Sequence, residues 1–225
     1  MARVWSIVVA GGAGRRFGER KQFSSLGGRP VLAWAVEACR GVSDGVVLVV
    51  PAGVEADDPS HAGADAVVAG GATRADSVRH GLHAVPTDAD IVVVHDAARP
   101  LASPALFAAV LAALREEGVD GAIPGLAPSD TIKVVDEAMN VTSTLDRAAL
   151  VAVQTPQAFR AAALRAAHAH VGAETGPGGA ATDDAMLVEA TGGKVRVVPG
   201  HAENLKITTP DDLVAAERLL AGRGT

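Results

Sequence analysis

The stretch that decides the fold spans residues 4–17 and reads VWSIVVAGGAGRRF. Its first part, Val4–Val9, is a continuous apolar run, which is typical of a strand buried on both faces of a parallel sheet. A glycine-rich turn follows directly. In open α/β sheets the loops at the carboxyl ends of strands bind ligands, and glycines there expose backbone N–H groups that suit phosphate. We therefore expect an α/β fold with its ligand site at this loop.

Strands and helices are predicted to alternate along the rest of the chain. Short β-branched runs alternate with Ala- and Leu-rich stretches of helical period, as in parallel sheets covered by crossover helices. The predicted strands are 4–9, 46–50, 66–69, 91–94, 119–123, 151–154 and 195–198, and the predicted helices are 30–40, 74–85, 104–117, 158–170 and a last helix from Pro210. The pattern predicts a single Rossmann-like domain over residues 1–225, with a mostly parallel sheet flanked by helices.

Helix starts carry recognisable capping signals. Ser103 and Thr209 each precede a proline at the first predicted helical position. Thr73 and Asp76 have the spacing of a capping box. Thr182 is expected to cap the helix after the glycine-rich loop 172–181.

One segment interrupts the alternation. Residues 130–147 predict two strands, 131–135 and 141–145, joined by a turn. A hairpin inserted into a parallel α/β domain extends the sheet or projects from it. We expect a projecting β-hairpin arm over residues 130–147.

Composition excludes some classes of partner. The formal net charge is −6, with 26 acidic against 20 basic residues, which argues against a general affinity for nucleic acid or for an anionic membrane. The run Val4–Ala10 is too short for a signal peptide or a membrane span, so the sequence predicts a cytoplasmic protein. The one cysteine, Cys39, lies in an apolar helical stretch and is expected to be a core residue.

Three interpretations compete for the glycine loop. A dinucleotide fingerprint fails because Phe17 occupies the position of the third glycine and no acidic residue ends the second strand. A P-loop fails because its motif is absent from the sequence. In the third interpretation, Arg16 and Lys21 curl back over a triphosphate. The plain alternative is a glycine turn with surface arginines.

The loop and several later motifs resemble 2-C-methyl-D-erythritol 4-phosphate cytidylyltransferases of the nonmevalonate route to isoprenoids. The motifs that carry the resemblance run almost from end to end: 10–17, Lys21-Gln22-Phe23, 26–30, Gly70-Gly71 with Arg74 and Ser77, 95–100, Asp130-Thr131, Asp146-Arg147, Thr155-Pro156-Gln157, Thr182-Asp183-Asp184 and Asn204-Leu205-Lys206. Each motif is weak alone, but together they occur in the family's order over about 200 residues.

The resemblance implies a nucleotidyltransferase with CTP and methylerythritol phosphate as substrates. A phosphate monoester oxygen attacks the α-phosphorus of CTP and pyrophosphate leaves. Because the monoester is mostly dianionic near neutral pH, it needs no general base, but the transition state needs positive charge. Arg16 and Lys21 are expected to supply that charge, and Asp96 is expected to bind Mg²⁺. The alternative for Asp96 is a helix cap or turn residue.

The resemblance also assigns the two substrate sites. The nucleotide side comprises Ala10, Gly11, Gly12, Gly14, Gly71, Ser77, Asp96 and Ala97. The acceptor side comprises Asp130, Thr131, Arg147, Thr155 and Lys206, of which Arg147 and Lys206 are also counted as catalytic. Arg99 either orients Asp96 or holds a phosphate. The family's arm reaches across a homodimer, so Thr131 and Arg147 are expected to serve the partner's substrate.

Two departures and two rival functions accompany this interpretation. Ala72 stands where some relatives carry an acidic residue near the base, and Phe23 stands where some carry tyrosine. The closest rival is a sugar-phosphate or molybdopterin nucleotidyltransferase with the same loop. A rival of another class is a silent module that only holds a nucleotide. The histidines, such as His80 and His83, predict no transition-metal site.

Overall fold

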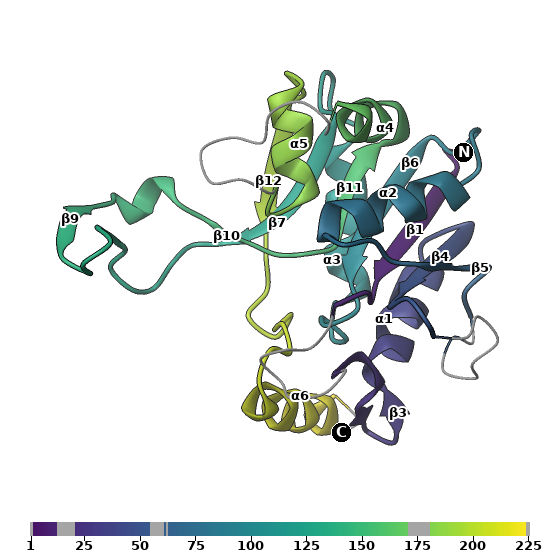
Figure 1. Ribbon diagram of the computed structural model, residues 1–225, viewed down its shortest axis with the longest axis horizontal. Helices are drawn as coiled ribbons and strands as arrows, with labels where there is room; N and C mark the ends of the chain where they lie inside the picture. The colour runs from purple at the N-terminus through teal and green to yellow at the C-terminus, as the bar shows by residue number, and fades with distance from the viewer. Residues whose placement is uncertain (1, 13–20, 55–60, 62, 171–180, 224–225) are drawn as a thin grey trace.

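The structure is a computed structural model that describes residues 2–12, 21–54, 61, 63–170 and 181–223 (Figure 1). Its strands are β1 (Val4–Val9), β2 (Ser25–Leu26), β3 (Arg29–Pro30), β4 (Gly45–Val50), β5 (Ala66–Ala69), β6 (Ile91–Asp96), β7 (Gly121–Leu126), β8 (Lys133–Val135), β9 (Val141–Thr144), β10 (Ala152–Val153), β11 (Gln157–Arg160) and β12 (Val195–Pro199). Its helices are α1 (Val31–Arg40), α2 (Arg74–Ala84), α3 (Pro104–Ala113), α4 (Ala161–Ala169), α5 (Asp184–Ala190) and α6 (Pro210–Gly222), with short 3-10 turns η1 (Lys21–Phe23) and η3 (Arg147–Ala149). Among the described helices, none has the length and apolar character needed to span a membrane.

The main sheet confirms the predicted α/β class and its mostly parallel character. Its strand order is β10-β7-β11-β6-β1-β4-β5, with β12 beside β7. β1 is parallel to β4 and to β6, β4 is parallel to β5, and β12 is parallel to β7. β11 is the exception in the middle of the sheet, because it runs antiparallel to both β6 and β7. The amino end of β11 therefore lies beside the carboxyl ends of β6 and β7.

The predicted helix 158–170 was wrong at its start. Ala158 and Phe159 belong to β11, and the helix begins only at Ala161. Phe159 is fully buried between β6 and β7. A Cβ added to the neighbouring Gly121 would lie 2.7 Å from the Phe159 ring. This pairing is a tertiary contact, which the local sequence does not reveal.

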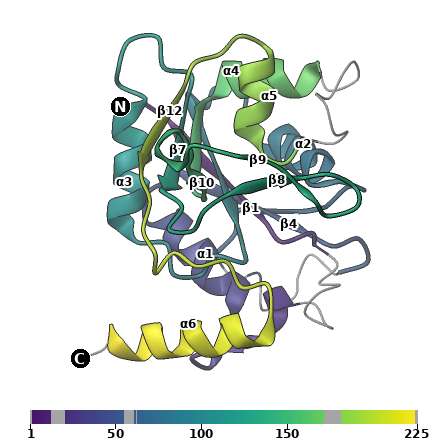
Figure 2. The same ribbon diagram turned by 90° about the vertical axis from the view of Figure 1, so that its left-hand side faces the viewer.

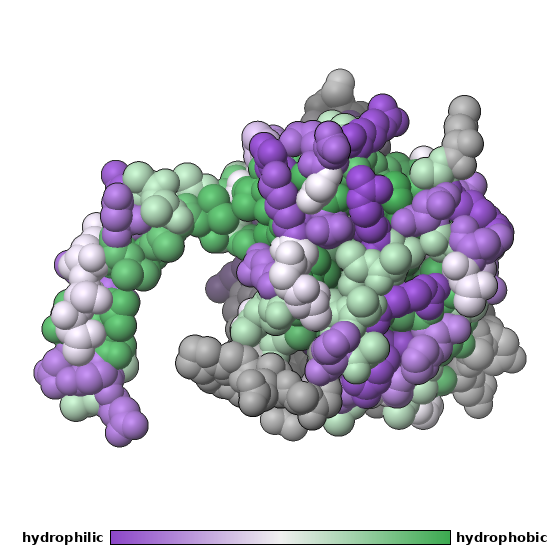
Figure 3. Space-filling model, turned by 90° about the horizontal axis from the view of Figure 1, so that it is seen from above, coloured by the Kyte–Doolittle hydropathy of each residue, from purple (hydrophilic) through white to green (hydrophobic). Residues whose placement is uncertain are grey.

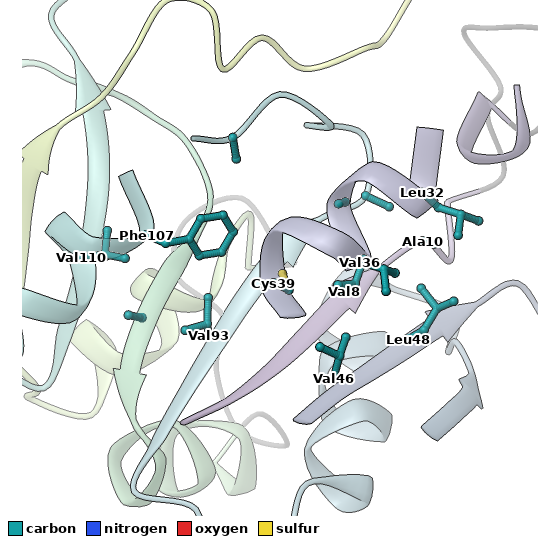
Figure 4. Packing of buried hydrophobic residues seen from close by; sticks show 14 of the residues in the cluster. Val8, Ala10, Leu32, Val36, Cys39, Val46, Leu48, Val93, Phe107 and Val110 are labelled. Atoms are coloured by element: carbon teal, nitrogen blue, oxygen red, sulfur yellow. The ribbon is translucent and has the colours of Figure 1, made fainter. Parts of the chain in front are cut away.

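Apolar residues on the two faces of the sheet form separate clusters because neighbouring strand residues point to opposite sides. Val8 faces α1 and α3, where Cys39 and Phe107 are fully buried, as predicted for Cys39 (Figure 4). Ile7 faces the other side, where it packs with residues of α2, α4 and α5. The sheet is thus covered on both faces, which explains its uninterrupted apolar strands.

Three of the four predicted helix caps are confirmed. Ser103 and Thr209 accept the expected backbone N–H, and Thr73 forms a full capping box with Asp76. The prediction for Thr182 was wrong by one residue. Asp183 is the cap of α5, and its side chain accepts from the Met186 N–H at 3.0 Å.

The last helix, α6, packs at one end of the molecule, near α1 (Figure 2) and beside the small β2–β3 hairpin (Figure 1). Leu26, Val31, Leu101, Ile207 and Ala216 form a separate apolar cluster there. This cluster fixes the segment before α6, which contains Lys206.

The segment 130–147, which we call the arm, projects from the body as expected (Figure 1). β8 and β9 pair antiparallel within it. Its larger apolar side chains are 40% to 75% exposed: Val134, Val135, Met139, Val141 and Leu145. Hydrophobic residues run along the arm in the space-filling view (Figure 3). The apolar side chains of the arm therefore form no core within the single chain. An isolated two-stranded hairpin of this kind has little stability of its own.

Candidate active site

A cavity of about 640 Å³ opens at the carboxyl ends of β1 and β6. Residues from five segments line it: 9–12, 21–22, 71–74 with Ser77, 96–98, and Lys206 with Thr208. This is the edge of the sheet at which α/β folds bind ligands. Nine of the predicted site residues line the cavity: Ala10, Gly11, Gly12, Lys21, Gly71, Ser77, Asp96, Ala97 and Lys206.

The beginning of the glycine loop is held by a buried glutamine. Gln22 donates from Nε2 to the backbone oxygen of Ala10 at 2.8 Å and to that of Gly12 at 3.2 Å. These bonds turn the two carbonyl groups toward Gln22. Lys21, the first residue of η1, lines the cavity beside this loop. Gly14 and Arg16 lie outside the described residues, so their predicted roles remain predictions.

Ser77 fixes a second glycine turn against the first. Its hydroxyl donates to the Thr73 backbone oxygen at 2.9 Å and accepts from the Gly71 N–H at 3.1 Å. A Cβ on Gly71 would overlap Asp76, and one on Gly11 would lie 3.2 Å from the Ser77 hydroxyl. A serine hydroxyl has two acceptor lone pairs. These two bonds therefore leave one lone pair of the Ser77 hydroxyl, which lines the cavity, without use.

Asp96 ends β6 and carries the negative charge of the cavity. Lys206 Nζ lies 2.7 Å from Oδ2, and Arg74 Nε lies 3.4 Å from Oδ1. Burial alone would raise the pKa of the Asp96 carboxyl, but Arg74 and Lys206 hold that pKa well below its usual range. The carboxylate is therefore negatively charged at neutral pH.

Lys206 reaches Asp96 because the backbone beside it is anchored. The next residue, Ile207, is fully buried and donates its N–H to the Ala98 backbone oxygen at 2.8 Å. This bond joins the segment before α6 to the segment after β6. Residues 110 positions apart in the chain thereby form an ion pair.

The residues that line the cavity suit a divalent cation that takes most of its ligands from a substrate and water. Among the described residues, no three His, Cys, Asp or Glu side chains converge to form a closed metal site. Asp96 supplies a single carboxylate in the cavity. Mg²⁺ is commonly bound by one or two carboxylates together with substrate phosphates and water. The donor set thus suits a cation that arrives with a nucleotide.

A chain of hydrogen bonds fixes the backbone of Asp96. His95 Nε2 lies 3.1 Å from the Arg99 carbonyl, which can only accept, so this nitrogen carries the proton. His95 Nδ1 then accepts from the Thr155 hydroxyl at 3.0 Å, and the same hydroxyl oxygen accepts from the Asp96 N–H at 3.0 Å. Burial lowers the pKa of His95 to about 4, which agrees with a neutral ring. Thr155 thus supports Asp96 from beneath the cavity.

Arg99 lies behind Asp96 and does not line the cavity. Its guanidinium donates to the Asn204 backbone oxygen at 2.6 Å. Its charge helps to lower the pKa of Asp96, after the larger effects of Arg74 and Lys206. Both roles considered for Arg99, the orientation of Asp96 and contact with a phosphate, remain predictions.

The arm residues stay apart from the cavity within one chain. Asp130, Thr131 and Arg147 are exposed and do not line it. Arg147 donates to the Ser129 backbone oxygen at 2.5 Å, at the base of the arm. The arm extends away from the body that holds the cavity (Figure 1). Of the predicted acceptor residues, the single chain therefore brings Lys206 and Thr155 to the cavity region but keeps Asp130, Thr131 and Arg147 away from it.

Three further residues belong to the quoted motifs but had no role assigned from the sequence. Gln22 and Arg74 line the cavity, and Asp184 is a buried partner of Arg74. The capping box at Thr73 is the signal that could have placed Arg74, because it fixes the start of α2 at the sheet edge. Thr208 was missed altogether, and it lines the cavity beside Lys206.

Comparison with known proteins bears on the whole chain. Residues 4–222 match the family described as 2-C-methyl-D-erythritol 4-phosphate cytidylyltransferase. The protein of that name from Rhodococcus jostii is 48% identical over 222 residues, which cover 96% of this chain and 95% of that protein. A bifunctional enzyme (IspD/IspF) from Clavibacter michiganensis is 46% identical over 97% of this chain. This chain spans only about half the length of such bifunctional relatives, 55% in that case.

Solved structures agree with the sequence relatives. The crystal structure of 2-C-methyl-D-erythritol 4-phosphate cytidylyltransferase from Thermus thermophilus superposes with a TM-score of 0.78 at 36% identity, over 96% of this chain and 98% of that one. The 4-diphosphocytidyl-2C-methyl-D-erythritol synthase from Anaerococcus prevotii gives a TM-score of 0.79 at 29% identity, over 98% of this chain and 99% of that one. The family match, the sequence relatives and the solved structures agree, and the chain belongs to the 2-C-methyl-D-erythritol 4-phosphate cytidylyltransferase family.

Proposed function

We propose that the chain transfers the cytidylyl group of CTP to 2-C-methyl-D-erythritol 4-phosphate, releasing pyrophosphate and forming 4-diphosphocytidyl-2-C-methyl-D-erythritol. The observation that carries the proposal is the cavity at the ends of β1 and β6. There, glycine backbone, the charged Asp96 carboxylate and the cations Lys21 and Lys206 lie together. Family membership supplies the identity of the substrates.

The reaction needs charge more than proton transfer. An oxygen of the acceptor's phosphate forms a bond to the α-phosphorus of CTP, and the bond from that phosphorus to the bridging oxygen breaks. Pyrophosphate leaves with the electron pair. The attacking phosphate is mostly a dianion near neutral pH, its second pKa being about 6, so it needs no base. Lys21, and Arg16 by the family resemblance, stabilise the charge that grows on the equatorial oxygens.

Asp96 is the residue that would hold Mg²⁺ together with the triphosphate. When bound, the ion supplies positive charge against the phosphate oxygens. Lys206 adds a cation on the opposite oxygen of the same carboxylate. Thr155, His95 and Arg99 keep the Asp96 backbone in place through the hydrogen bonds described above.

Cytosine is read by small residues. Ala10 and Gly11 let main-chain groups approach the edge of the base, and Gly71 does so from the opposite turn. The remaining acceptor of Ser77 suits the exocyclic amino group of cytosine, which uracil lacks. Ala72 is exposed at the rim of the cavity and has no polar side chain for this task.

The acceptor site is completed by a second copy of the chain. The arm exposes its apolar side chains and holds Thr131 and Arg147 away from its own cavity. A homodimer in which each arm covers the partner would bury that apolar surface and would bring Arg147 near the partner's Lys206. Asp130 and Thr131 would then bind the acceptor from the same arm.

Pyrophosphate release tests the function. The four ribonucleoside triphosphates are compared, each with and without methylerythritol phosphate, at saturating Mg²⁺. We expect release only with CTP and only with the acceptor. Equal turnover with a hexose 1-phosphate would support the sugar-phosphate rival, and nucleotide binding without turnover of any acceptor would support the silent module.

A further inference from the structure

Arg74 lies between two carboxylates that come from distant parts of the chain. It is the first residue of α2 and lines the cavity. One guanidinium nitrogen lies 2.7 Å from Asp184 Oδ2, while Nε lies 3.4 Å from Asp96 Oδ1. The two distances show that Asp184 holds the guanidinium more closely than Asp96 does.

Asp184 is well built for holding a cation. Its side chain is 1% exposed, and its other oxygen accepts from His168 Nε2, on α4, at 3.0 Å. Asp184 takes no part in capping α5, because the neighbouring Asp183 does that. Removing the cationic partner of a buried carboxylate costs free energy, and this cost favours the conformation in which Arg74 stays on Asp184.

Arg74 could also compete with a divalent cation for the carboxylate of Asp96. A guanidinium has a planar fork of donors that matches a carboxylate with two parallel hydrogen bonds. In that arrangement it would cover both oxygens of Asp96 and repel a divalent cation. Lys206 already lies on Oδ2 at 2.7 Å. Oδ1, at 3.4 Å from Arg74, is the oxygen that is held least.

We propose that Asp184 is a positioning residue for the nucleotidyl transfer: it draws Arg74 away from Asp96 and so keeps Asp96 Oδ1 available to a divalent cation bound with the nucleotide. This inference rests on the role of Asp96 given under the proposed function. Asp184 itself touches neither substrate nor cation. His168 assists by holding the second oxygen of Asp184 in place.

The test is a double-mutant cycle on cation binding, without turnover. Asp184→Asn keeps the shape of the side chain but removes the charge that holds Arg74. Binding of Mn²⁺ in the presence of CTP, without acceptor, is measured by electron paramagnetic resonance. We expect Asp184→Asn to weaken Mn²⁺ binding roughly tenfold or more, the usual scale for residues that support a metal ligand. In the Arg74→Gln background the same substitution should change Mn²⁺ binding less than about twofold, because the competitor is gone.

Two controls separate this mechanism from simpler ones. Asp183→Asn removes a neighbouring charge that does not contact Arg74, and asparagine is also a good cap. It should leave Mn²⁺ binding unchanged, whereas an equal loss in both variants would mean a general field effect and would overturn the proposal. An equal loss from Asp184→Asn with and without Arg74 would also overturn it. Asp96→Asn tests the proposed function separately: if Asp96→Asn does not weaken Mn²⁺ binding, the role of Asp96 itself is wrong.

A second measurement needs no variant and holds even if Asp184→Asn fails to fold. In a crystal structure of the wild-type protein with CTP and Mg²⁺, Arg74 should remain hydrogen-bonded to Asp184, with the cation on Oδ1 of Asp96. An Arg74 that has left Asp184 for Asp96 or the triphosphate would overturn the proposal.

Discussion

At the scale of single residues, the site depends on a few charged groups that the fold keeps at fixed places. Lys21 is one of them, since it lines the cavity at the end of the glycine loop. We expect Lys21→Ala to lower kcat by roughly 10²-fold or more, as the loss of one contact to a developing oxyanion does elsewhere. Steady-state kinetics at saturating CTP and acceptor measure this. A change in KM alone would make Lys21 a ground-state binder.

His95 makes a prediction about stability against pH. Burial disfavours the charged ring, so the pKa of His95 is lowered from its ordinary value of 6.5 to about 4 in the folded protein. Between these values the unfolded chain binds the extra proton. The stabilising contribution is therefore complete above pH 6.5 and is lost as the pH falls toward 4, by about 1.4 kcal/mol per pH unit.

Urea unfolding at pH 7, 6 and 5 measures that slope. His95→Gln removes the titrating group, and its free energy of unfolding should vary less over the same range. Carboxylates with lowered pKa values, such as Asp212 at about 2, lose their contribution only at lower pH. The same slope in wild type and variant would show that His95 is not the source.

At the scale of elements, β11 joins two parts of the main sheet, because it pairs with β6 on one side and with β7 on the other. Phe159 fills the space between β6 and β7 and is fully buried. We expect Phe159→Ala to lower the free energy of unfolding by about 3–5 kcal/mol, the usual cost of emptying a core aromatic site. Val214→Ala, on the exposed face of α6, is the control and should change it by less than about 0.5 kcal/mol. Similar losses in both variants would contradict the assignment.

Prediction from sequence succeeded for elements with a strong local signal. Neighbouring residues determine the apolar runs of β1 and β4 and the capping box of α2. The structure has these three elements close to the predicted bounds. β11 was missed because it is only four residues long, Gln157–Arg160, and runs directly into a helix at Ala161, so the local pattern does not distinguish strand from helix. Its identity depends on Gly121, which is distant in the chain and leaves room for the Phe159 ring.

In the candidate site, too, residues with a local signal were predicted, whereas a contact between distant parts of the chain was not. Gly71, Ser77 and Asp96 were named from motifs at strand ends, and all of them line the cavity. The pairing of Arg74 with Asp184 spans 110 positions. No local pattern encodes such a distance, because it results from the way α2 and α5 pack around the sheet.

At the scale of the whole molecule, the arm decides whether a site belongs to one chain or to two. The proposed homodimer can be tested by subunit exchange between Lys21→Ala and Arg147→Ala, two variants that we expect to be inactive. If Arg147 serves the partner, each mixed dimer contains one intact site. Random pairing makes about half of the dimers mixed, so about a quarter of wild-type activity should return. If Arg147 serves its own chain, every site keeps a defect and nothing returns.

The control for subunit exchange uses the double variant Lys21→Ala/Arg147→Ala mixed equally with wild type. Activity is compared with that of an equal total amount of protein that is all wild type. With a shared site it should fall from about a half to about a quarter of this reference during exchange, because mixed dimers have no intact site. With a self-contained site it should stay at about a half. A tagged pull-down shows that exchange has taken place.

The antiparallel course of β11 has a consequence for synthesis on the ribosome. β6 ends at Asp96, but its second neighbour, β11, extends to Arg160. At elongation rates of about 5–20 residues per second, several seconds separate the emergence of the two strands. During that interval the inner edge of β6 is open, and its run Ile91–Asp96 is mostly apolar. The nascent chain is therefore exposed to wrong strand pairing at the strand whose carboxyl end borders the cavity in the folded protein.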